Sequence, residues 1–181
     1  MQKFISLLRG INVSGQKKIK MADLKALYEA VGLVDVSTYI QSGNVIFSSP
    51  NDDRDKIKSR LESAIEQKYS FQVPVEIRTA SEFKKILSNV PFNGINPGED
   101  GAKVLVSFLS AVPAEKDIET IKNYVVPPEQ LEIQGQEVYL HCPNGYGRSK
   151  LSNVFLEAKL KVTATTRNLR SIAKLCELAG I

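Results

Sequence analysis

Short apolar runs alternate along the chain with longer stretches in which apolar residues recur every three or four positions. The short runs are typical of buried strands and the longer stretches of amphipathic helices. In order, the first half contains a strand at 4–8, a helix at 21–31, strands at 36–40 and 44–48, a helix at 53–69 and a strand at 73–79. Thr79 and Glu82 have the spacing of a capping box and predict a further short helix.

The same order begins again after residues 91–101, a segment dense in glycine, proline and asparagine. The second half contains a strand at 103–109, a helix ended by Pro127-Pro128, a hairpin of strands at 129–133 and 137–141, a helix at 151–158, an edge strand near 161–163 and a last helix from Thr166. Each half therefore follows one βαββα plan.

This order of elements is that of the ferredoxin-like, or split βαβ, arrangement. We therefore predict an α+β protein with two ferredoxin-like half-domains in tandem, whose antiparallel sheets carry helices on one face. The predicted limits are 1–90 for the first half with its linking helix, 91–102 for a linker and 103–181 for the second half with its C-terminal helix.

The composition agrees with an ordinary globular chain, since 43% of residues are hydrophobic and 24% are charged. Two cysteines, Cys142 and Cys176, are too few for a disulfide framework and lack metal-ligand spacing. The N-terminal apolar stretch is short and broken by Arg9, and no segment approaches the ~20 apolar residues that span a bilayer. We expect a cytoplasmic protein with no membrane partner.

Positive charge is unevenly distributed. The net charge is +4, and basic residues gather before Met21 and after His141, while residues 115–137 lean acidic. Such asymmetry suits an anionic partner, either small or polymeric. The alternative is a solvated surface that keeps the protein in solution.

Five blocks carry a family signature: Leu7–Val13, Lys20-Met21, Tyr39–Val45, Gly147–Leu151 and Thr165–Asn168. The chain resembles the bacterial domain-of-unknown-function family numbered sixteen ninety-seven over nearly its whole length. The resemblance implies a duplicated ferredoxin-like fold and supplies no activity. Two positions depart from it, because Ser14 stands where glycine is expected and Leu169 where tryptophan is expected. The second departure argues against aromatic stacking there.

The predicted topology brings two polar segments to one edge of the first sheet. The first and third strands of a ferredoxin-like sheet are antiparallel neighbours, so the end of one lies beside the start of the other. A binding site predicted there contains Arg9, Asn12, Lys17, Lys18, Gln41, Ser42 and Asn44. Their donors would form a cradle for a phosphate or carboxylate. In the alternative, these residues only shape two turns and Arg9 pairs with a carboxylate.

A second predicted binding segment contains Arg148, Ser149 and Lys150. Ser149 is expected to cap the following helix, whose free N–H groups and neighbouring cations suit an anion. The GxxxxGK[ST] spacing of a P-loop is absent. A capped helix start without any ligand is the alternative.

Catalytic and metal sites have little support in the sequence. His141 is the single histidine, and its neighbour Cys142 would point to the opposite face of a continuing strand. Cys176 falls on an apolar helix stripe, and Asp52 and Asp53 fit helix capping. We assign no catalytic residue, metal or cofactor.

The leading functional prediction is binding of a small anionic ligand, phosphorylated or nucleotide-like. The alternative is a nucleic-acid-associated protein that uses its basic C-terminal surface. The predicted strand at 4–8 faintly resembles the aromatic-bearing first strand of an RNA-recognition motif, but the strand at 44–48 lacks the Gly-Phe-Gly-Phe pattern that stacks on bases. Both resemble core strands instead. Ligand identity, catalysis and oligomeric state are left open.

Overall fold

The computed structural model describes residues 1–181. Its first seven elements are β1 (Gln2–Leu8), α1 (Met21–Ala30), β2 (Val34–Tyr39), β3 (Asn44–Ser49), α2 (Arg54–Tyr69), β4 (Val75–Thr79) and α3 (Ala80–Ser88). The next are β5 (Val104–Leu109), α4 (Glu115–Lys122), β6 (Gln130–Gln134), β7 (Glu137–His141), the 3-10 turn η1 (Tyr146–Arg148), α5 (Asn153–Leu160), β8 (Ala164–Asn168) and α6 (Leu169–Ala179).

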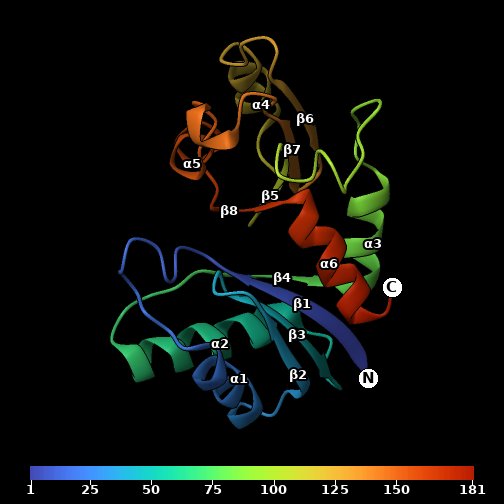
Figure 1. The fold of residues 1–181 in the computed structure, drawn as a ribbon. Coiled ribbons are helices and arrows are strands. Elements are labelled where there is room, and N and C mark those ends of the chain that lie inside the picture. The colour runs from blue at the N-terminus through green and yellow to red at the C-terminus, as the bar shows by residue number, and fades with distance from the viewer. The chain divides into compact units, whose positions relative to one another are not determined.

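The strands form two antiparallel four-stranded sheets with the orders β2-β3-β1-β4 and β6-β7-β5-β8. Contacts divide the chain into a first unit, Met1–Lys84 with Leu175–Ile181, and a second unit, Lys85–Lys174. Residues 2–88 and 104–179 each follow the same order of elements, βαββαβα (Figure 1), and the last helix of each half, α3 or α6, is divided between the two units. The predicted α+β fold with tandem ferredoxin-like units is confirmed.

Matching hydrogen bonds at the ends of the first strands show how closely the two units correspond. In the first unit, Leu8 N donates to Gly43 O at 2.8 Å, and in the second Leu109 N donates to Gln136 O at 2.8 Å. The next residue in each unit, Arg9 or Ser110, donates from its N–H to the segment before the last strand, at 3.0 Å in both cases. The units can therefore be compared position by position along these strands.

Helices α1 and α2 cover one face of the first sheet (Figure 1) and enclose its core. Phe4 and Phe47 are fully buried there, with ring centroids 5.5 Å apart, and Tyr28 meets Phe47 edge-on at 5.6 Å. The Tyr28 hydroxyl hydrogen-bonds to the Ser6 hydroxyl at 2.8 Å, which satisfies both buried groups. These aromatic rings belong to the core, as the sequence predicts, and are not available to stack on bases.

The second unit buries an equivalent apolar layer that includes Leu105, Leu140 and Leu156. A serine in the middle of β5, Ser107, occupies the place that Ser6 has in β1 and hydrogen-bonds to the Thr166 hydroxyl at 2.6 Å. β1 and β5 thus each carry one buried serine whose hydroxyl is satisfied by a side chain.

Helix starts follow the predicted capping chemistry at Thr79, where Thr79 N donates to Glu82 Oε2 at 2.7 Å and Glu82 N donates to Thr79 Oγ1 at 3.2 Å. The expected cap at Ser149 is wrong. The N-cap of α5 is Ser152, whose Oγ accepts from Phe155 N at 3.3 Å. Ser149 instead follows the 3-10 turn, and its Oγ accepts from Leu151 N at 3.0 Å.

The last strand and helix begin later than the sequence predicts. Lys161 ends α5 in a left-handed conformation with φ 60°, so the chain turns there instead of extending. The strand β8 then runs over Ala164–Asn168, where it pairs with β5, and α6 begins at Leu169. The edge strand expected at 161–163 therefore begins at Ala164, and the helix expected from Thr166 begins at Leu169.

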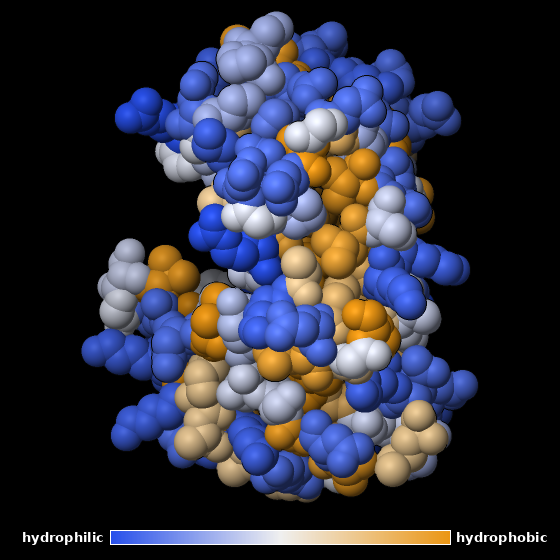
Figure 2. All heavy atoms as spheres, turned by 45° about the vertical axis from the view of Figure 1, so that its right-hand side comes forward, coloured by the Kyte–Doolittle hydropathy of each residue, from blue (hydrophilic) through white to orange (hydrophobic).

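No helix of this fold is both long and apolar enough to cross a membrane. Figure 2 shows one face of the molecule, on which hydrophilic side chains predominate and hydrophobic ones gather in patches between them.

Candidate functional site

The connection between β1 and α1 is a long loop with an unusual backbone. It contains twelve residues, 9–20, whereas the equivalent connection of the second unit, between β5 and α4, contains five, 110–114. Left-handed conformations occur at Gly10, Asn12, Ser14, Gly15 and Lys17. Non-glycine residues adopt such conformations rarely, and only where the surrounding structure holds them.

The side-chain amide of Asn12 holds this loop together. Its Nδ2 donates to Ile19 O at 3.0 Å and to Gln41 O at 2.7 Å, and its Oδ1 accepts from Ile19 N at 2.9 Å. The two bonds with Ile19 hold the second half of the loop against the first, because the Asn12 amide bonds to both the N–H and the C=O of one residue. The bond to Gln41 O ties the loop to the β2–β3 turn, so the two polar segments predicted to meet do lie together.

Asn44 organises the β2–β3 turn from within. It is fully buried, and its Nδ2 donates to Tyr39 O at 3.0 Å and to Ser42 Oγ at 3.0 Å. The turn also approaches the loop closely at Gly43, which has φ 79°. A Cβ there would lie 2.7 Å from both Ile11 Cδ1 and Leu8 Cβ.

The basic residues of the loop lie at its surface. Lys17 and Lys18 are exposed and Arg9 is half-buried. Lys17 Nζ donates to Gln72 O at 2.8 Å, which fixes that ammonium beside the segment before β4. No aspartate or glutamate occurs before Asp23, so the loop itself carries no negative charge.

The predicted residues thus fall into two groups by their contacts. The amides of Asn12 and Asn44 bond to the two turns, and their partners there include Gln41 O and Ser42 Oγ. Arg9, Lys17 and Lys18 carry the charge. Their role toward a ligand stays a prediction.

The sequence-based prediction of this edge of the sheet did not include residues 70–74. The predicted fold would have placed them there, because the fourth strand of a ferredoxin-like sheet starts beside the end of the first.

The second predicted segment lies in another long connection. Residues 142–152 join β7 to α5 with eleven residues, where the first unit joins β3 to α2 with four, 50–53. Arg148 and Lys150 are exposed on this loop, while Ser149 is half-buried. Burial, together with the negative Glu129, raises the pKa of the Cys142 thiol, and a hydrogen bond with Ser149 opposes part of that rise. Ser149 thus also serves the loop's own structure.

The remaining reactive side chains are held by structural contacts. His141 Nδ1 lies 3.2 Å from Gln130 Oε1, and its ring centroid lies 5.7 Å from that of Phe92. Cys176 is buried, and burial raises the pKa of its thiol to about 11. Across residues 1–181, no group of three or more His, Cys, Asp or Glu side chains comes together in a way that could hold a metal ion.

Comparisons with known proteins agree with this fold. The model of a family described as a protein of unknown function, DUF1697, matches residues 1–139. The conserved bacterial protein SP0830 from Streptococcus pneumoniae has a similar structure, with a TM-score of 0.77 and 23% sequence identity over 98% of this chain and 98% of that one. At this identity the similarity shows the fold alone. No curated protein matches the chain. The predicted family resemblance is confirmed, and this chain belongs to the DUF1697 family.

Proposed function

We propose that this protein binds a small anionic ligand, phosphorylated or nucleotide-like, at the β1–α1 loop. The observation that carries the proposal is the difference between the two units at this point. Both end their first strand with the same hydrogen bonds, yet one continues through twelve residues and the other through five. Because five residues suffice for this connection in this fold, the longer, strained loop is a feature beyond what folding requires.

The charge of the two connections also favours the first unit's loop as the binding site. The longer loop carries Arg9, Lys17 and Lys18 and no acidic residue. The shorter connection leads directly into Glu115 and Asp117 in the first turn of α4. An anion is therefore attracted to the first unit's edge and repelled from the equivalent edge of the second.

Rigidity favours binding at this loop. The three hydrogen bonds of the Asn12 amide and the bond from Lys17 Nζ to Gln72 O fix the backbone and one ammonium before a ligand arrives. A preorganised site loses less conformational entropy on binding than a mobile one. The loop 142–152, with Arg148, Ser149 and Lys150, would form a second anion-binding segment by the same reasoning.

The test is a titration with inorganic pyrophosphate and with an adenine nucleotide, followed through backbone amide shifts. The double variant Lys17→Gln, Lys18→Gln should bind at least about tenfold more weakly, since each lost charge contact contributes roughly 1 kcal/mol. Lys25→Gln with Lys56→Gln is the matched control, because both lysines pair with carboxylates on helices of the same unit. Equal weakening in the control, or no shift in loop 9–20 at millimolar ligand, would refute the proposal.

A second candidate is association with nucleic acid through the basic C-terminal surface, which the exposure of Arg148, Lys150 and Arg170 favours. Such binding would fall by orders of magnitude between low and physiological salt, because phosphate contacts release counterions. Oligonucleotide binding that ignores salt would exclude it.

A further inference from the structure

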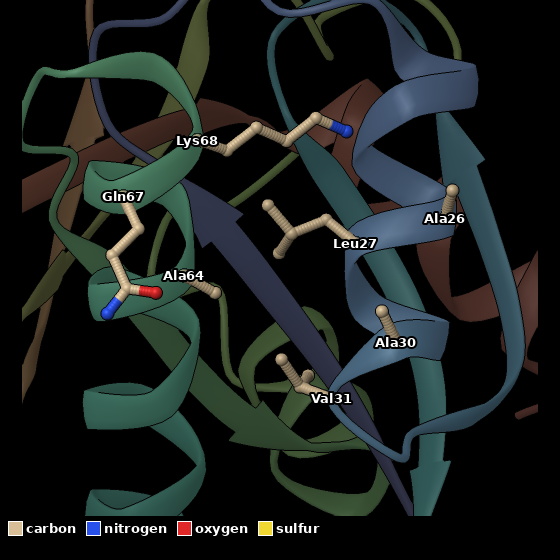
Figure 3. Close-up of a pocket in the computed structure, with 7 residues that line it drawn as sticks. All are labelled: Ala26, Leu27, Ala30, Val31, Ala64, Gln67 and Lys68. Atoms are coloured by element: carbon tan, nitrogen blue, oxygen red, sulfur yellow. The ribbon is translucent and has the colours of Figure 1, made fainter.

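A groove between α1 and α2 lies away from the loop just described. It has a volume of about 490 Å³ and is lined by Ala26, Leu27, Ala30, Val31, Ala64, Gln67 and Lys68. Figure 3 shows Leu27 reaching from α1 toward α2, and Lys68 reaching from α2 toward α1 above Leu27. The volume is within the ~300–1,000 Å³ typical of small-molecule sites. Three of its lining residues are alanines, so the groove exists because the side chains there are short.

The second unit shows what occupies the same place when the side chains are longer. Helices α2 and α5 both end at a left-handed residue, Ser70 and Lys161, each with φ 60°. Counting back from these ends matches Lys68 with Lys159, and Ala64 with Phe155. An aromatic ring thus stands in the second unit where the first has a methyl group.

The aromatic residue meets a second ring from the facing helix. Tyr124 follows the C-terminal end of α4, and its ring centroid lies 5.2 Å from that of Phe155 in an edge-on arrangement. Lys159 Nζ lies 4.6 Å from the Tyr124 centroid and 5.7 Å from the Phe155 centroid. The second unit therefore places two rings, the half-buried Phe155 and the exposed Tyr124, beside a lysine whose Nζ also donates to Tyr124 Oη at 3.1 Å.

The first unit keeps the lysine but has no ring at either of these two positions. Counted from the C-caps Val31 and Asn123, Gly32 takes the place of Tyr124, and Ala64 takes the place of Phe155. Lys68 Nζ lies 5.5 Å from the centroid of Tyr69, which is outside the lining and whose ring stacks on Phe71 with centroids 5.7 Å apart. Lys68 is the only charged residue of the lining, and an ammonium is attracted to the electron-rich face of an aromatic ring.

We propose that this groove binds a small planar aromatic molecule of one or two rings, which lies beside Ala64 where the second unit has the ring of Phe155. Leu27 and Val31 form its apolar floor, and the Lys68 ammonium lies over the ring face. The inference does not depend on the anion-binding loop, because no residue is shared between the two.

The test uses 2-naphthol as the probe and its saturated counterpart, decahydro-2-naphthol, which has the same skeleton without a π face. With ¹³C-labelled alanine methyl groups, 2-naphthol should shift the signals of Ala26, Ala30 and Ala64 saturably at millimolar concentration. Lys68→Gln should weaken the binding about two- to fivefold, as expected for one partly exposed cation–π contact. Lys56→Gln, on the same helix, is the charge-matched control.

Refilling the groove gives an independent result. Ala64→Phe restores the second unit's residue and should abolish binding, whereas Ser63→Phe adds the same ring at an exposed neighbour outside the lining and should leave binding unchanged. Equal binding of the saturated probe, unchanged binding in Ala64→Phe, or no alanine shift in the wild type would overturn the proposal. If Ala64→Phe does not fold, the Lys68→Gln comparison decides.

Discussion

Replacing Asn12 by alanine tests whether this side chain holds the β1–α1 loop together. The substitution removes three hydrogen bonds, each with a net contribution of about 0.5–1 kcal/mol at a partly exposed site. Alanine at φ 55° also lacks the side-chain hydrogen bonds that let asparagine adopt a left-handed conformation, which adds about 1 kcal/mol to the loss of stability. We expect a total loss of about 3 kcal/mol in the stability of the first unit.

Asn12→Gly separates the two contributions, because glycine adopts φ 55° without strain. This variant should lose about 2 kcal/mol, the part that belongs to the amide. The gap of about 1 kcal/mol between the two variants measures the backbone part.

Native-state hydrogen exchange is the suitable assay, since the slowest amides report unfolding of the unit to which they belong. The slowest amides of β1 should exchange about 150-fold faster in Asn12→Ala and about 30-fold faster in Asn12→Gly, at roughly 1.4 kcal/mol per tenfold change. The slowest amides of β5, in the other unit, serve as the reference within the same molecule. Exchange from β1 within about threefold of the wild type in both variants would show that the amide of Asn12 is dispensable, contrary to its three contacts.

Three further outcomes follow from particular contacts. Gly43→Ala should destabilise the protein by about 3 kcal/mol, because the new Cβ would meet Leu8 Cβ at 2.7 Å and the backbone has φ 79°; urea denaturation measures the loss. Burial raises the pKa of the Glu82 carboxyl, but hydrogen bonds at the start of α3 and nearby arginines lower it below its usual value overall. The stabilising contribution of the ionised Glu82 is therefore present above the unfolded-state pKa of 4.5 and lost as the pH falls through the lower folded-state value. In urea denaturation, Glu82→Gln should be less stable than the wild type at pH 7, and the difference between the two proteins should shrink in acid. Cys142 and Cys176 are buried with raised pKa values, so neither should react with a thiol reagent at pH 8 until urea unfolds the chain, and fast reaction of either would contradict the burial.

The fold could be predicted from the sequence because most elements carry their own signal. Residues 4–8 and 103–109 are apolar runs, and the turns between hairpin strands contain glycine where positive φ is needed. The strand β8 was misplaced because its sequence, Ala-Thr-Thr-Arg-Asn, has a single apolar residue and no alternating pattern. It extends because β5 has an open edge to pair with, which only the tertiary structure provides.

The candidate site could be predicted only as a location. Strand topology placed residues 9–12 beside residues 41–44, and they do lie together. A sequence cannot say whether an asparagine amide faces a ligand or the chain itself, and the structure assigns Asn12 and Asn44 to backbone groups. The choice between Ser149 and Ser152 as a cap likewise depends on where the preceding turn ends, since an apolar residue follows each serine by two positions.

The placement of residues 175–181 in the first unit affects how this protein is made. Lys3 Nζ donates to Ala179 O at 2.8 Å, so a residue near the start of the chain bonds with one near its end. On the ribosome, the residues that complete the first unit emerge after the whole second unit, about 5–20 s after Lys84 at ~5–20 residues per second. Synthesis from the N-terminus therefore leaves the first unit incomplete until residues 175–181 have emerged and packed onto it.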